Sequence, residues 1–265
     1  MKQGFEITRD LIRGTWGKPL FRGHSCRLDG LDTFCFFVGN DEHQGRLICQ
    51  LLNHHPQILI SGGSNSFRLL EKGLTEHQLY DLICRTRYGR RKSGSLRVIG
   101  DRRAGASARE IFSRPRSVDS VAEKITLAKK FLHAYRNPFD AIASSSLKGA
   151  RPGGSVTRPR LEQEVRQYFE RCTGVKLVHT NFGAQQLFLM NHDRLVADPV
   201  RTLTDLCTFF AVDCPESFLD EGRQAIRESD RKTRYAVPWD ADLKALVRSR
   251  IREFFWLEPY QQEDF

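Results

Sequence analysis

Long apolar runs are absent from this chain. None of its 265 residues belongs to a stretch approaching the roughly 20 apolar residues that a membrane-spanning helix needs. Residues 1–13 mix charged with apolar residues and lack the apolar centre of a secretory signal. These absences argue against an integral membrane protein, and we expect a cytoplasmic protein without a membrane partner.

Closely spaced cysteines are absent as well. The seven cysteines are widely scattered, form no C-x-x-C pair and show no zinc-finger spacing. Their odd number and scatter predict reduced, mostly structural thiols. Three histidines, His54, His55 and His133, lack a third ligand at helical or hairpin spacing, so no metal site is expected.

The phosphate-binding motif G-x-x-x-x-G-K-[ST] does not occur, and the loop after the first predicted strand contains no lysine. A P-loop nucleotide kinase or NTPase is therefore the weakest functional hypothesis. No RNA-binding aromatic motif occurs either, and no nucleic-acid partner is expected.

Positive charge, by contrast, is abundant. Forty-two Lys and Arg oppose 32 Asp and Glu, a net charge of +10. Much of the excess lies between Arg85 and Arg103, where eight basic residues accompany one acid, Asp101. Such a surface attracts anions, including an anionic substrate or a doubly phosphorylated nucleotide. For residues 90–92, a solvated basic loop is the better interpretation.

Predicted strands alternate with predicted helices along the whole chain. A continuous apolar run, typical of a strand buried on both faces, predicts a strand at 33–39, and shorter mainly apolar segments predict strands at 58–60, 96–100, 131–135 and 186–190. Helical patterns fall at 47–54, 64–87 (split near Gly73, with Thr75 as N-cap), 138–146, 161–172, 199–211, 215–227 and 240–255. We expect a single α/β domain over residues 1–265, with a mostly parallel central sheet flanked by helices. Within it, 1–30 is expected to be irregular and 148–160 to form a mobile loop, because both are rich in glycine.

The most informative segment joins the fourth predicted strand to its helix. Arg136 ends the strand, Pro138 opens the helix, and Ser144 follows eight residues after Arg136. A planar guanidinium and a hydroxyl brought together in this way suit a phosphate monoester. The alternative is an ordinary strand-to-helix turn with proline at the first helical position. Asp140 is expected to cap its helix or form an ion pair within it.

The pattern R-N-P-x-D-x-x-x-S resembles the 3′-phosphate-binding segment of sulfotransferases that use the sulfonate donor PAPS (3′-phosphoadenosine 5′-phosphosulfate). Four more segments resemble this family in order and spacing: LLNHHP at 51–56, LRVIGDRR at 96–103, NHDRLVADP at 191–199 and RKT at 231–233. The resemblance implies a P-loop NTPase-like sulfotransferase fold, PAPS as donor and 3′-phosphoadenosine 5′-phosphate as product. It also implies that Arg136 and Ser144 bind the 3′-phosphate and that Arg231 and Lys232 belong to a basic donor loop.

The loop that should hold the donor's 5′-phosphosulfate departs from the family pattern. It reads NDEHQGR at 40–46, and Glu42 stands where the family has a basic residue. Gly45 still permits a tight turn, Arg46 could supply the missing charge, and Gln44 accompanies them as a candidate donor contact. Two interpretations stay open: an adapted donor loop, with Glu42 turned to solvent, or a loop closed to the donor.

Sulfonate transfer needs a base for the acceptor and charge stabilisation at the sulfonate. Asp101 and His43 are the candidate bases, and Arg102 is the candidate for the sulfonate oxygens. The function hypothesis is transfer of a sulfonate from PAPS to a hydroxyl or amine of a small-molecule acceptor, such as a secondary metabolite. The alternative is a catalytically impaired protein of the same fold that binds an adenosine bisphosphate or another anionic ligand.

Overall fold

A computed structural model describes residues 26–39, 42–89, 92, 94–103, 111, 123–148, 155–226 and 232–262. Residues 42–44 are described as part of a helix, without their side chains. The side chains of His43 and Gln44, and all of Arg231, therefore lie outside the described residues, as do 1–25 and 149–154.

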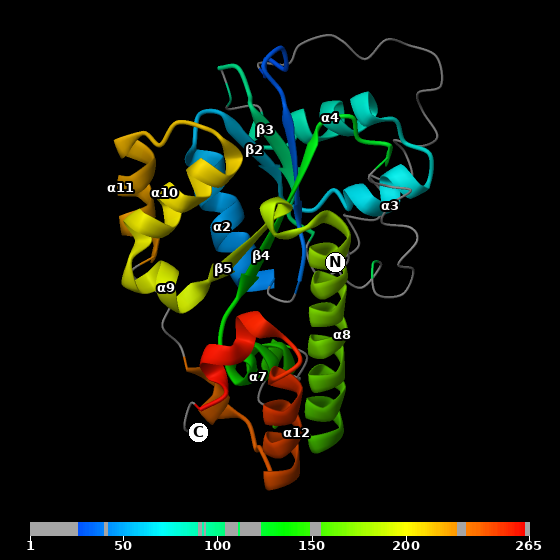
Figure 1. Cartoon of the computed structure of the whole chain (residues 1–265), viewed down its shortest axis with the longest axis vertical. Helices are drawn as coiled ribbons and strands as arrows, with labels where there is room; N and C mark the ends of the chain where they lie inside the picture. The colour runs from blue at the N-terminus through cyan, green and yellow to red at the C-terminus, as the bar shows by residue number, and fades with distance from the viewer. Residues whose placement is uncertain are drawn as a thin grey trace.

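A five-stranded sheet forms the centre of the molecule (Figure 1). Its strands are β1 (Thr33–Phe37), β2 (Ile58–Ser61), β3 (Val98–Asp101), β4 (Ala128–Tyr135) and β5 (Leu187–Asn191). They lie in the order β2-β3-β1-β4-β5, and every pairing between them is parallel. The expected α/β class with a mostly parallel sheet is confirmed.

The helices and 3-10 turns follow the strands along the chain. They are α2 (Glu42–His54), α3 (Ser66–Glu71), α4 (Glu76–Cys84), α7 (Pro138–Lys148), α8 (Arg158–Phe182), η2 (Ala184–Gln186), α9 (His192–Ala197), α10 (Pro199–Phe210), α11 (Glu216–Ile226), η3 (Thr233–Ala236), α12 (Ala241–Ile251) and η4 (Phe255–Tyr260). Among the described helices, none is both long enough and apolar enough to cross a membrane.

Two apolar cores cover the two faces of the sheet, which is why its strands are mainly apolar where they are buried. On β1, Phe34 and Phe36 face the core shared with α3, α4 and α8, while Cys35 and Phe37 face the core shared with α2, α10 and α11. Figure 1 shows these two helical layers on opposite sides of the strands, with α7 and α12 beyond the end of β4. The alternation of side chains along each strand thus divides the molecule into layers.

Helix boundaries differ from the sequence prediction at several ends. Helix α8 runs on to Phe182, past the predicted end at 172, and α12 ends at Ile251, before the predicted end at 255. Helix α2 begins at Glu42, not at Leu47, so most of the predicted loop 40–46 is the first turn of a helix. Helix α8 begins at Arg158, so residues 158–160 of the predicted mobile loop are helical. The prediction placed Pro159 in the loop because proline breaks the interior of a helix. Proline is favoured in the first turn of a helix, however, and Pro159 lies there. The predicted cap at Thr75 is confirmed, with Gln78 completing a capping box.

Candidate functional site

The candidate residues gather at one edge of the sheet, where all five parallel strands end. Parallel α/β sheets bind ligands in the crevice outside the carboxyl ends of their strands. Tyr135 pairs with Asn191 across β4 and β5, so Arg136 and His192, which follow them, come from neighbouring strand ends. On the other side, Phe36 of β1 pairs with Asp101 of β3, which brings Asp101 to the same edge.

The segment from β4 to α7 has the predicted strand-turn-helix form. Arg136 follows β4 directly, and its Nη2 donates a hydrogen bond of 3.3 Å to the backbone oxygen of Asp140 in the first turn of α7. Asn137 caps the turn, because its Oδ1 accepts a 2.9 Å bond from the backbone N–H of Phe139. Ser144 is half-buried on the same helix. The unit formed by the end of β4, the turn and α7 therefore carries both predicted phosphate contacts.

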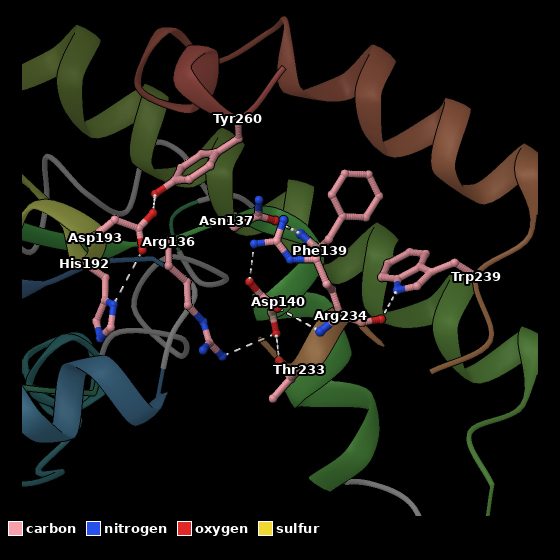
Figure 2. A network of polar contacts seen from close by, with 10 residues as sticks. All are labelled: Arg136, Asn137, Phe139, Asp140, His192, Asp193, Thr233, Arg234, Trp239 and Tyr260. Carbon is pink, nitrogen blue, oxygen red and sulfur yellow. Dashed lines mark hydrogen bonds and ion pairs between the residues drawn. The ribbon is translucent and has the colours of Figure 1, made fainter. Parts of the chain in front are cut away.

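Asp140 forms its ion pair outside its own helix, and this corrects the expectation from the sequence. Its Oδ2 lies 3.0 Å from Nη2 of Arg234, and its Oδ1 accepts a 2.8 Å bond from the backbone N–H of Arg234 (Figure 2). Both side chains are more than nine-tenths buried. Thr233 adds a 2.8 Å bond from its hydroxyl to the backbone oxygen of Asp140, which Arg136 also contacts.

These contacts dock η3 onto the start of α7. Lys232, one of the predicted donor-loop residues, immediately precedes η3 and is exposed. The bonds made by Thr233 and Arg234 thus bring the segment after the predicted basic loop beside Arg136. The sequence analysis singled out Arg231 and Lys232 and missed the contacts of Thr233 and Arg234, which anchor the segment.

The donor-loop region lies between β1 and α2. Gly39 has a φ of +115°, a conformation that favours glycine. Gly45 is buried in the first turns of α2, and Arg46 beside it is exposed. A side chain at Gly45 would come within 3.8 Å of Cγ of Arg102, so Arg102 packs against the start of α2.

Arg102 also spans to the loop that follows β2. Its backbone N–H donates to the oxygen of Ser61, and its side-chain Nε donates to the oxygen of Gly62 at 3.1 Å. The guanidinium thus lies between the donor-loop helix and the β2–α3 loop.

Asp101 is 4% exposed and already well supplied with hydrogen bonds. Its Oδ1 accepts a 3.0 Å bond from the backbone N–H of Ser64, and its Oδ2 accepts bonds from the backbone N–H and the hydroxyl of Ser66 at 2.7 and 2.9 Å. Burial raises the pKa of Asp101, while the bonds from Ser66 and Ser64 oppose that rise. The carboxylate therefore holds the β2–α3 loop, whatever further role it has.

A second polar group, not foreseen from the sequence, lies after β5. The hydroxyl of Tyr260 donates a 2.6 Å bond to Asp193 Oδ2, and Asp193 Oδ1 lies 3.8 Å from Nδ1 of His192 (Figure 2). The contact with His192 is the largest influence lowering the pKa of Asp193; burial opposes it, and the Tyr260 bond adds to it. Burial and the same bond to Asp193 raise the pKa of Tyr260.

Metal ligands do not cluster in the described part of the chain, where no group of three His, Cys, Asp or Glu side chains could hold an ion. The site is instead built from arginines, backbone N–H groups and hydroxyls. Such a donor set suits phosphate and sulfonate oxygens.

The fold is that of an α/β protein of the P-loop-like class, and the candidate residues lie at the carboxyl edge of its sheet. A family model described as "Sulfotransferase family" matches residues 124–216, which include β4, α7 and β5. The resemblance to sulfotransferases predicted from the sequence is thereby confirmed. No curated protein sequence matches the chain.

Several solved sulfotransferases share the fold. The sulfotransferase domain of the Synechococcus PCC 7002 olefin synthase is 17% identical, with a TM-score of 0.54, over 95% of this chain and 100% of that one. A sulfotransferase from Alicyclobacillus acidocaldarius is 18% identical, with a TM-score of 0.52, over 87% and 96%. Mouse sulfotransferase SULT7A1, complexed with PAP, is 12% identical, with a TM-score of 0.53, over 89% and 92%.

Proposed function

We propose that the protein is a PAPS-dependent sulfotransferase that transfers a sulfonate to a hydroxyl or amine of a small-molecule acceptor. The observation that carries the proposal is the β4–α7 turn: Arg136 at the strand end, Ser144 on the helix, and η3 docked beside them through Asp140. A phosphate monoester needs a guanidinium and hydroxyl donors fixed on a rigid element, and this turn supplies both. The solved relative complexed with PAP supports the choice of nucleotide.

The donor would span the strand ends. In this proposal Arg136 and Ser144 bind the 3′-phosphate, with Arg231 and Lys232 adding charge from the segment before η3. The 5′-phosphate end would meet Gln44, Gly45 and Arg46 at the start of α2, where backbone N–H groups and the helix dipole favour an anion.

The acceptor would then enter from the side of β3. Asp101 or His43 would take its proton, and Arg102, between α2 and the β2–α3 loop, would face the sulfonate oxygens. In-line transfer asks the protein for positioning and charge stabilisation rather than covalent chemistry, by analogy with phosphoryl transfer. The acceptor class remains broad; the olefin synthase domain of the same fold favours a secondary metabolite.

The test has two parts. Isothermal titration with 3′-phosphoadenosine 5′-phosphate should show one site per chain, and PAPS with a panel of phenols, alcohols and amines should yield a sulfated product. A parent protein that does not bind the nucleotide would overturn the proposal. Nucleotide binding without transfer to any acceptor would instead favour the impaired sulfotransferase-fold protein.

A further inference from the structure

The last described turn of the chain, η4, contacts the strands that carry the proposed nucleotide site. Two buried aromatic side chains make these contacts, Trp256 and Tyr260, which are 3% and 2% exposed. Figure 1 shows the segment in red beside α7 and the end of β4. Nothing in the sequence motifs assigns a role to it.

Tyr260 links the ends of β4 and β5. Its hydroxyl donates to Asp193 Oδ2 at 2.6 Å and accepts from Asn191 Nδ2 at 3.2 Å. Its ring packs edge-on against Tyr135, with 6.5 Å between the ring centroids. Tyr135 and Asn191 are paired residues on neighbouring strands, so one side chain braces both strand ends immediately before Arg136.

Trp256 is connected to the end of β1 through His133 of β4. Its ring packs edge-on against His133, with 5.8 Å between centroids, and His133 Nδ1 lies 2.9 Å from the backbone oxygen of Val38. Gly39 and the donor-loop region follow directly. Segment η4 therefore contacts β4 and β5 directly, and it is linked to the end of β1 through His133.

Asp193 connects Tyr260 to His192 and to the charge of Arg234. Its other carboxylate oxygen faces His192, and the positive charge of Arg234 contributes to lowering the pKa of Asp193. A carboxylate with two freely rotating oxygens would not keep these relations on its own. The Tyr260 hydrogen bond orients the carboxylate of Asp193, so that one oxygen accepts from Tyr260 and the other faces His192.

We propose that Tyr260 is a positioning residue of the nucleotide site: by holding Asp193 and Asn191 and packing on Tyr135, it orients the strand ends from which Arg136 is presented to an adenosine bisphosphate. The inference rests on the proposed function. Tyr260 acts through the residues it binds and need not touch the nucleotide.

The test compares two tyrosines that make the same kind of bond. Tyr260→Phe removes the hydroxyl that donates to Asp193. Tyr80→Phe is the matched control, because the buried Tyr80 on α4 donates its hydroxyl to Glu76, away from the strand ends named here. For each variant, the dissociation constant for 3′-phosphoadenosine 5′-phosphate and the melting temperature are measured, with titrations well below both melting temperatures.

Tyr260→Phe should weaken nucleotide binding by about fivefold or more, a loss of about 1 kcal/mol or more, whereas Tyr80→Phe should leave it within about twofold. Both variants should lose similar thermal stability. If the parent binds and Tyr260→Phe binds equally well, the positioning role is wrong while the proposed function stands. If the parent does not bind, the proposed function itself has failed. Should Tyr260→Phe not fold, Asp193→Asn replaces it: weaker binding supports the role, and unchanged binding overturns it.

Discussion

The imidazole of His133 occupies the space where a side chain at Gly39 would stand. A Cβ built on Gly39 would lie 1.9 Å from His133 Nδ1, far inside van der Waals contact. That nitrogen lies 2.9 Å from the oxygen of Val38, and since a carbonyl only accepts, Nδ1 carries the proton and donates it. His133 thus holds the backbone where β1 gives way to the donor-loop region, and it can do so only because residue 39 has no side chain.

The first prediction concerns this overlap. Gly39→Ala should cost about 1–3 kcal/mol of stability through overpacking, in addition to the strain of its positive φ, and should weaken nucleotide binding. Gly73→Ala is the control, because Gly73 has a φ of +93° but nothing within 4 Å of an added Cβ. Chemical denaturation gives the loss in free energy of unfolding for each variant, and the difference between the two losses is the contribution of the contact with His133. Equal losses would show that His133 moves aside easily.

A second prediction addresses the proposed 3′-phosphate contact. Arg136→Ala should remove a charge-assisted bond worth about 1.5–3 kcal/mol and weaken binding of 3′-phosphoadenosine 5′-phosphate roughly 10- to 150-fold. Arg136→Lys should recover only part, because an ammonium cannot reproduce the planar fork. The exposed Arg201 on α10 offers the control Arg201→Ala, which titration calorimetry should find unchanged. A parent-like affinity in Arg136→Ala would remove Arg136 from the site.

The strand-turn-helix unit was predictable because its determinants are local. Burial on both faces makes β4 an apolar run at Phe131–Tyr135, and Pro138 fits only the first turn of a helix. The start of α2 was not predictable in the same way. Glu42 and its neighbours are polar, so the apolar periodicity that marks a helix begins only at Leu47.

The ion pair of Asp140 shows the limit of local rules. Ion pairs between residues three or four apart on one helix can be predicted from the sequence. Arg234 is 94 residues from Asp140, so only the tertiary fold brings the two side chains together. Tyr260 lay beyond prediction for the same reason. Tyr260 belongs to no recognised motif, and its partner Asp193 lies 67 residues away, so only the tertiary fold brings the two together.

The third prediction tests the buried pair by a double-mutant cycle. Arg234→Met leaves Asp140 buried without its cation and should cost about 3–5 kcal/mol, with loss of nucleotide binding as η3 detaches from α7. Adding Asp140→Asn should recover part of that loss, because no uncompensated charge remains. Asp205→Asn breaks the exposed pair with Arg194 and should change stability by no more than about 0.5–1 kcal/mol. Urea denaturation measures five proteins: the parent, Arg234→Met, Asp140→Asn, the double variant and the Asp205→Asn control. Strictly additive losses in the cycle would contradict the coupling.

A fourth prediction concerns pH and His55, which is fully buried. Its Nε2 donates to the oxygen of Asp213 at 2.7 Å, and its Nδ1 accepts from the N–H of Gln57 at 3.2 Å, an arrangement that requires the neutral ring. Burial lowers the pKa of His55 below its ordinary value of 6.5. As pH falls below about 6.5, the unfolded chain binds a proton that the folded chain does not, so the free energy of unfolding should decrease. It should be measured at several pH values between 5 and 7.5, roughly spanning the histidine range.

The comparison with His55→Asn separates the contribution of His55 from that of the other ionisable groups of the chain. The variant should be less stable at neutral pH and show a shallower dependence on pH. A variant as pH-sensitive as the parent would show that His55 is not responsible for the loss.

The last prediction asks which residue is the base, if sulfonate transfer is observed. Asp101→Asn is a poor test, because the amide would place an N–H₂ group against the N–H donors of Ser64 or Ser66 and loosen the β2–α3 loop. Ser66→Ala is cleaner. The Ser66 hydroxyl lowers the pKa of Asp101 against the effect of burial, so its removal should raise that pKa further.

A base must be ionised to act, so with Asp101 as base the acid limb of the rate profile should already lie above about pH 4 in the parent and move to higher pH in Ser66→Ala. With His43 as base, the limb should stay where it is in Ser66→Ala and disappear in His43→Asn. A limb unmoved by both substitutions would exclude both residues, because neither titration would then control the rate.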